Sequence, residues 1–122
     1  MLPNYYIVNE IILLVIIMTV YQTYKIYELL ENINEDEYRK TICKNLRNFR
    51  MEHYNQYKKE NGNLERSNNP YSTENLSNYL GISKTHYKRL ESENDKSKYI
   101  SLDNLIKLSI IFDKKIDEFL EK

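Results

Sequence analysis

The chain of 122 residues is long enough for one compact domain with an appendage, but not for two domains with separate cores. Its formal net charge of zero hides two unlike parts: residues 1–37 carry one lysine against six acidic residues, whereas residues 38–122 carry 17 basic residues against 12 acidic ones. One cysteine, two histidines and two glycines exclude an internal disulfide, metal-site spacing and a glycine-rich phosphate loop, so we expect no cofactor, no metal and no enzymatic activity.

The N-terminal segment is apolar without interruption from Ile11 to Val20. Because this run has no polar stripe, a helix formed by it would be apolar on every face. The helical spacing of Tyr24, Tyr27 and Leu30 predicts that the same helix continues beyond the run.

The sequence leaves three interpretations of this helix open. It is a membrane anchor through residues 5–24, with tyrosines near both ends and no lysine or arginine before Lys25, which would leave the remainder in the cytoplasm. Asn9 and Glu10 argue against an anchor, because a carboxylate in a bilayer is costly. Otherwise it is a dimerisation or core helix, or a signal-like segment or wrongly assigned start, although a cleaved signal peptide would begin with basic residues.

An acidic stretch over residues 31–37 follows, which is typical of a linker or of a surface helix end, and we place the domain boundary at its end, between regions 1–37 and 38–122. From Tyr38 onward, apolar residues recur at three- and four-residue steps, which predicts an amphipathic helix. The lone Cys43 falls on this helix and is expected to be a buried hydrophobe, whereas Arg50 is expected to be on its polar side.

Residues 55–70 are rich in lysine and asparagine and end in Asn-Asn-Pro, which predicts an insertion outside the core that is either a polar loop or a frayed helix end. Two interpretations are open. The insertion is a disordered loop, or it forms a wing that contacts DNA through Lys58, Lys59 and Arg66.

Three short helices are predicted next, each preceded by a serine that can cap it: Ser72, Ser83 and Ser101. Gly81 is expected to end the first of them in a left-handed conformation, so that two helices meet across three residues. A last turn follows the third helix. The positions expected to be buried on these elements are Leu76, Tyr79, Leu80, Tyr87, Leu90, Leu105, Leu108, Phe112, Ile116, Phe119 and Leu120.

The segment from Tyr71 to Glu91, YSTENLSNYLGISKTHYKRLE, resembles the helix-turn-helix of the XRE family, within the Cro and lambda-repressor superfamily. The resemblance continues through SLDNLIKL at 101–108 and IDEFL at 116–120, and spans about Ile42 to Leu120. It implies an all-α, lambda-repressor-like bundle of about five helices, here preceded by the long apolar helix. The sequence departs from the family pattern in the 55–70 insertion, in Thr73 where glutamine is common, and in Glu93 where glycine is common.

The resemblance also implies a site, in which the second helix of the pair reads double-stranded DNA. With Tyr87 and Leu90 buried, the remaining side chains point outward and can meet base edges, with an arginine at the flank for a phosphate. The start of the first helix can hold a phosphate through free backbone N–H groups. The candidate DNA-binding residues are Ser72, Thr73, Ser83, Lys84, Thr85, His86, Lys88 and Arg89.

The plain alternative is that Lys84, Lys88 and Arg89 only solvate a helix face and that His86 is a passive surface residue. We expect a transcriptional regulator that binds its operator as a homodimer, with a cytoplasmic DNA-binding domain attached to the membrane by a single span. The alternative from another class is a membrane-anchored protein-interaction module that uses the same domain to bind a protein partner.

Overall fold

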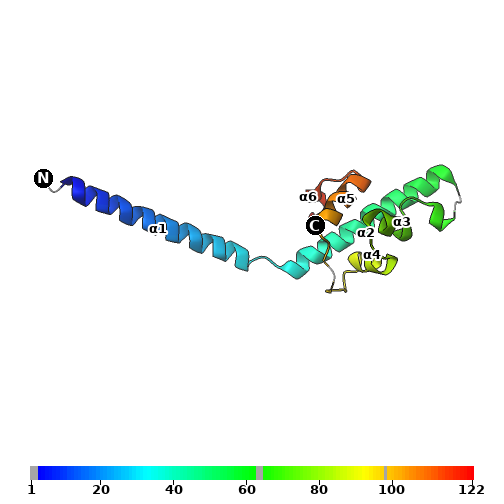
Figure 1. Ribbon diagram of the computed structural model, residues 1–122, viewed down its shortest axis with the longest axis horizontal. Coiled ribbons are helices and arrows are strands. Elements are labelled where there is room, and N and C mark those ends of the chain that lie inside the picture. The colour runs from blue at the N-terminus through cyan, green and yellow to red at the C-terminus, as the bar shows by residue number, and fades with distance from the viewer. Residues whose placement is uncertain (1–2, 63–64, 98) are drawn as a thin grey trace. The chain divides into compact units, whose positions relative to one another are not determined.

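A computed structural model describes residues 3–62, 65–97 and 99–122 (Figure 1), with side chains described from Tyr6 onward. The described residues are helical and include no β-strand, which confirms the all-α class. They divide into two compact units, one ending at Asn34 and the other comprising Glu35–Lys122. Each unit is treated by itself below.

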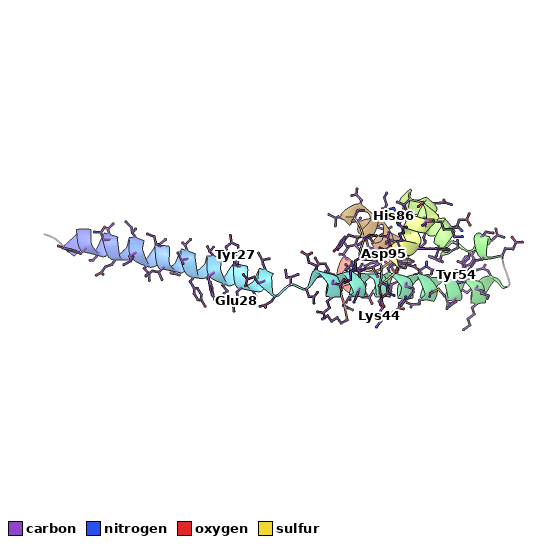
Figure 2. All side chains as sticks on the ribbon, turned by 90° about the horizontal axis from the view of Figure 1, so that it is seen from below. Tyr27, Glu28, Lys44, Tyr54, His86 and Asp95 are labelled. Carbon is purple, nitrogen blue, oxygen red and sulfur yellow. The ribbon has the colours of Figure 1, made fainter. Side chains whose placement is uncertain are left out.

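The first unit is a single helix, α1 (Pro3–Glu31). All of its described side chains are exposed, and Figure 2 shows them standing out around the helix. Residues Tyr6–Glu31 are long and apolar enough to cross a membrane by length and composition, and none of this span is buried. The hydroxyls of Thr19 and Thr23 donate to backbone carbonyls four residues earlier, at 2.9 and 2.8 Å, so they need no water.

The second unit contains five α-helices and one 3-10 turn among its described residues. They are α2 (Glu35–Asn61), η1 (Arg66–Asn68), α3 (Thr73–Leu80), α4 (Lys84–Leu90), α5 (Leu102–Phe112) and α6 (Ile116–Phe119). α2 is the long element, and the shorter helices pack along one part of it (Figure 1).

α2 extends at both ends beyond the amphipathic stretch that begins at Tyr38. Glu35, Asp36 and Glu37 are its first turn rather than a linker, because carboxylates are favourable at the positive end of a helix dipole. At the other end, residues 55–61 continue the helix, which agrees with the predicted helix end and excludes the loop for these residues. Tyr57 explains this extension: it is half-buried, and its ring lies 6.5 Å from that of Tyr71.

The rest of the predicted insertion also packs against the domain. Asn69 is buried, and its amide donates to the carbonyl of Tyr54 at 3.0 Å. The backbone N–H of Tyr71 donates to the Asn69 side chain at 2.9 Å. The two ends of residues 55–70 therefore pack against the domain, whereas the sequence predicted that this segment contributes nothing to the core; Asn63 and Leu64 lie outside the described residues.

The core of this unit joins α2 to the four shorter helices. Its buried residues are Leu46, Leu76, Leu80, Tyr87, Leu90, Leu105, Leu108, Phe112 and Phe119. Phe49 of α2 packs edge-on against Phe119, with ring centroids 5.0 Å apart. Cys43 is buried, as expected. Burial of the apolar side chains is the main favourable contribution to the stability of this unit.

Two predicted core residues are exposed instead. Tyr79 is 50% exposed because the buried row of α3 runs through Leu76, Ser77 and Leu80, with the Ser77 hydroxyl donating to the carbonyl of Glu74. Leu120 is 46% exposed because α6 ends at Phe119, whose ring occupies the core.

Candidate functional site

The central feature of the second unit is the pair of short helices α3 and α4. Ser72 caps α3 by accepting from the backbone N–H of Asn75 at 3.1 Å, and Ser83 caps α4 by accepting from that of His86 at 3.0 Å. Between them Gly81 has φ +69°, a left-handed conformation that glycine adopts without a Cβ penalty. Three residues therefore suffice to turn the chain from one helix into the next.

Tyr87 and Leu90 hold α4 to the core, since both side chains are almost completely buried. Ser83, Lys84, Thr85, Lys88 and Arg89 are exposed, whereas His86 is half-buried. The exposed set places three basic side chains on this one short helix, which allows contacts with an anionic partner.

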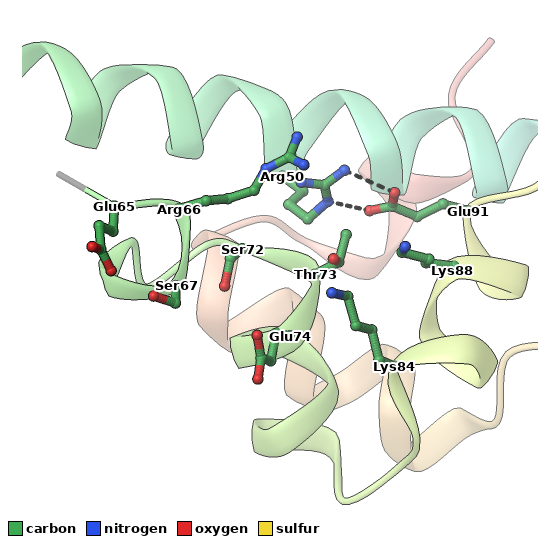
Figure 3. A pocket seen from close by; sticks show the side chains of 10 residues that line it. All are labelled: Arg50, Glu65, Arg66, Ser67, Ser72, Thr73, Glu74, Lys84, Lys88 and Glu91. Carbon is green, nitrogen blue, oxygen red and sulfur yellow. Dashed lines mark hydrogen bonds and ion pairs between the residues drawn. The ribbon is translucent and has the colours of Figure 1, made fainter. Parts of the chain in front are cut away.

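A groove of about 630 Å³ lies beside α4 (Figure 3). It is lined by Arg50, Glu65, Arg66, Ser67, Ser72, Thr73, Glu74, Lys84, Lys88 and Glu91. Lys84 and Lys88 extend into it from α4, opposite the beginning of α3. Of the predicted site residues, the groove therefore brings together Ser72, Thr73, Lys84 and Lys88; the other four do not line it.

Ser72 differs from its predicted role. Its side chain is buried and serves as the cap of α3, and its backbone N–H donates to the carbonyl of Asn69 at 3.1 Å. The prediction of a free N–H at Ser72 is therefore wrong. Thr73, the first residue of α3, is half-exposed on the wall of the groove.

Arg89, predicted to contact a phosphate, is already in an ion pair. Its Nε lies 3.6 Å from Oδ2 of Asp95, in the loop after α4, while half of the side chain is exposed. An exposed ion pair of this kind contributes little to stability and can open when a stronger anion approaches.

Sequence reasoning missed an ion pair inside the groove. Arg50 of α2 donates to both carboxylate oxygens of Glu91, through Nε to Oε1 and through Nη2 to Oε2 (Figure 3). The hydroxyl of Tyr87 donates to the same Oε1 at 2.9 Å. Burial, reinforced by the charge of Glu91, raises the pKa of Tyr87 far above its ordinary value, so this phenol stays protonated and remains a donor.

Although burial opposes its charge, Arg50 also has a raised pKa, because Glu91 accepts its hydrogen bonds and balances its charge. The charges of Arg50 and Glu91 therefore cancel each other. The cations of the groove that remain are Arg66, Lys84 and Lys88, and Glu65 and Glu74 line the same groove.

The hydrogen bonds of Arg39 are a second feature that sequence reasoning missed. Its side chain is 3% exposed, and its guanidinium donates to the carbonyls of Ser92, Glu93 and Asp95 at 3.4, 2.7 and 3.0 Å. Its hydrogen bond to Asp36 is the main reason why the pKa of that carboxyl lies below its ordinary value. Arg39 thus fixes the loop that leaves α4. The only signal in the sequence was an arginine next to the apolar positions at the start of α2. This pattern does not distinguish a buried arginine that holds a loop from a solvated charge.

The described residues contain no group of three histidine, cysteine, aspartate or glutamate side chains able to hold a metal ion. Burial raises the pKa of the Cys43 thiol, which makes it a poor nucleophile. No family model matches the chain, and no curated protein or solved structure is significantly similar to it.

Proposed function

We propose that this chain is a sequence-specific DNA-binding transcriptional regulator of the helix-turn-helix type, tethered to a membrane by α1 and active as a homodimer. The observation that supports it most directly is the α3–α4 pair: two serine-capped helices joined through left-handed Gly81, with Tyr87 and Leu90 buried and the basic face of α4 exposed.

In this proposal α4 enters the major groove, whose width admits one helix. Lys84 and Thr85 lie in its first turn and read base edges, since the N-terminal residues of a recognition helix meet the bases. Lys88 and Arg66, which line the groove of the protein, and Arg89 beside them hold phosphates. Phosphate contacts fix the register of the protein on DNA without reading its sequence.

The proposed tether depends on the length and apolar character of Tyr6–Glu31. Lys25 is the first basic residue of the chain, and basic residues concentrate on its C-terminal side. By the positive-inside rule, this asymmetry orients the second unit towards the cytoplasm, where DNA is accessible.

One observation favours a second candidate function, a membrane-anchored module that binds a protein. Glu65 and Glu74 line the same groove as Lys84 and Lys88, and carboxylates at that position repel a phosphate backbone. A protein surface that carries both signs of charge would instead be complementary to this groove.

The test is selection from a library of random double-stranded DNA by the full-length chain in lipid vesicles, at about 150 mM salt, where non-specific binding is weakened. We expect enrichment of one two-fold symmetric sequence, and loss of that enrichment in the Lys84→Ala/Thr85→Ala chain. A version that starts at Ile33 should enrich the same sequence but remain with the soluble fraction when vesicles are floated. Absence of any enrichment would contradict the regulator and favour the protein-binding module.

A further inference from the structure

One side of α1 carries an open groove. It has a volume of about 390 Å³ and is lined by Val15, Met18, Thr19, Gln22, Thr23 and Ile26. Four of these residues follow one another at steps of four, three and four positions, the repeat that keeps one side of a helix against a second helix. We call these four residues the α1 row: Val15, Thr19, Gln22 and Ile26.

Gln22 is the member of the row that needs a hydrogen-bond partner. The hydroxyls of Thr19 and Thr23 donate to backbone carbonyls of their own helix, whereas the Gln22 amide has no partner within the described part of the chain. If the span is centred between its charged ends, Glu10 and Lys25, then Gln22 lies about 7 Å from the bilayer midplane. This depth is well inside a hydrocarbon core about 30 Å thick. Lipid tails have no donor or acceptor, so the amide requires a partner from protein.

A second copy of α1 can supply that partner. A carboxamide is both donor and acceptor, so two Gln22 side chains that meet across a two-fold axis satisfy each other. Two anchors that insert in the same direction are parallel, and each residue of the row then faces its own counterpart. A single polar position within an apolar row favours this one register, because any shift would leave both amides unpaired.

The charged residues of α1 favour pairing through the same side. Because identical residues meet in a parallel pair, a contact through a charged side would bring like charges together. All charged residues of α1 lie at least about 90° around the helix from the middle of the α1 row: Glu10, Lys25, Glu28 and Glu31. Leu13, Ile16 and Val20 form another uncharged side, but lipid alone satisfies these apolar side chains.

We propose that α1 is a dimerisation helix as well as an anchor, and that two copies pair in parallel through the α1 row, with the two Gln22 amides hydrogen-bonded to each other. This inference rests on the membrane-tethered homodimer of the proposed function and names its interface. Only three residues separate α1 from α2, so paired anchors would hold two DNA-binding units close together. A two-fold symmetric operator requires two such units.

Disulfide cross-linking locates the paired side. The full-length chain, with Cys43→Ala to remove the native thiol, receives single cysteines in α1 and is placed in vesicles of phosphatidylethanolamine and phosphatidylglycerol with copper phenanthroline as oxidant. We expect Val15→Cys and Thr19→Cys to form about five-fold more dimer than Leu13→Cys and Ile17→Cys, which lie on the far side of the helix at similar depths. Equal yields at the four positions, or a maximum on the far side, would overturn the proposed contact.

Variants of Gln22 test the hydrogen bond. Energy transfer between chains labelled at Met51→Cys, an exposed position on α2, measures the dimer fraction in the same vesicles, again with Cys43→Ala. Gln22→Leu should weaken dimerisation by roughly ten-fold, whereas Gln22→Asn keeps an amide and should retain most of it. Asn9→Leu removes an amide from another side of α1 and is the matched control, which should have no effect. A Gln22→Leu chain that pairs as well as the unsubstituted one would overturn the contact.

The two proposals fail separately. Selection of a DNA sequence by the unsubstituted chain, together with equal cross-linking of Thr19→Cys and Ile17→Cys, would overturn this contact and leave the regulator standing. Preferential cross-linking at the α1 row without DNA selection would overturn the regulator and leave the contact. A full-length chain that does not float with vesicles would overturn both the tether and the pairing within the bilayer.

Discussion

Glu91, at the C-terminal end of α4, is joined to Arg50 in the middle of α2 by two hydrogen bonds of an ion pair whose side chains are 8% and 11% exposed. Tyr87 donates to the same carboxylate. The exposed face of α4 is therefore oriented by a charge on another helix as well as by apolar packing. A change at this pair should alter stability and the presentation of Lys84 and Lys88 together.

We expect Glu91→Gln to lower the free energy of unfolding by about 3 kcal/mol, because it leaves the Arg50 charge buried without its counter-ion. Urea unfolding of the full-length chain in detergent, followed by circular dichroism, measures this. Glu52→Gln, the same chemical change on the exposed side of α2, is the control and should have almost no effect. Equal midpoints for the two variants would show that the ion pair contributes no net stability.

The turn between α3 and α4 gives a second prediction. Gly81→Ala should destabilise the unit by about 1 kcal/mol, because alanine is strained at φ +69° even though a Cβ there meets no neighbouring atom within 4 Å. Gly81→Asn should cost less, since asparagine tolerates the left-handed region. The order of the two unfolding midpoints is the measurement, and a more stable alanine variant would be inconsistent with the described turn.

A third prediction concerns Arg39 and the loop after α4. Arg39→Lys should fail to replace the native residue, because an ammonium lacks the planar set of donors that reaches the carbonyls of Ser92, Glu93 and Asp95 together. Amide hydrogen exchange over residues 92–97 should rise by roughly ten-fold as the loop opens. Lys40→Ala, at the exposed neighbouring position, is the control. Unchanged amide exchange in Arg39→Lys would show that the hydrogen bonds of Arg39 do not hold this loop.

Cys43 gives a fourth prediction. Its thiol should react with a disulfide reagent at least ten-fold more slowly in the folded chain than in urea, because burial both blocks access and raises its pKa. The rate of thionitrobenzoate release measures this at neutral pH. Met51→Cys in a Cys43→Ala chain provides an exposed thiol on the same helix and should react fast in both conditions. A fast reaction of folded Cys43 would mean that α2 does not bury this position.

The proposed DNA contacts divide into two classes, which gives the fifth prediction. Lys84→Ala and Thr85→Ala should reduce the preference for the selected sequence over random DNA, each by about 1–3 kcal/mol of discrimination. Lys88→Ala should weaken binding to every sequence and lower the slope of log affinity against log salt by about one. Fluorescence anisotropy at several salt concentrations separates the two effects. Equal losses on all sequences from all three variants would mean that α4 reads no bases.

The elements that sequence reasoning predicted correctly depend on local signals. Ser72, Ser83 and Ser101 each precede a helix and accept from an amide three residues later, and Gly81 has the left-handed conformation expected after α3. The buried rows of α4 and α5 likewise follow from three- and four-residue spacing. These features involve residues close together in the chain, so a single sequence contains the necessary information.

What the sequence could not predict depends on distant residues. Arg50 and Glu91 are 41 positions apart, and Arg39 reaches carbonyls more than 50 positions away. An arginine at the edge of an amphipathic helix has the same pattern whether it is solvated or paired with a buried carboxylate. The sequence could not decide between a loop and a helix end after residue 55 for a related reason, because the support for the helix comes from the ring of Tyr71 across a connection of polar residues.

The short connection between the two units limits where the proposed regulator can act. Only Asn32, Ile33 and Asn34 separate α1 from α2, and three extended residues span at most about 10 Å. A DNA-binding unit that is tethered to a bilayer by so short a connection cannot diffuse along the chromosome in search of its operator. The chromosome must come to the bilayer instead, so the distance of a gene from the cell boundary would decide whether that gene is regulated.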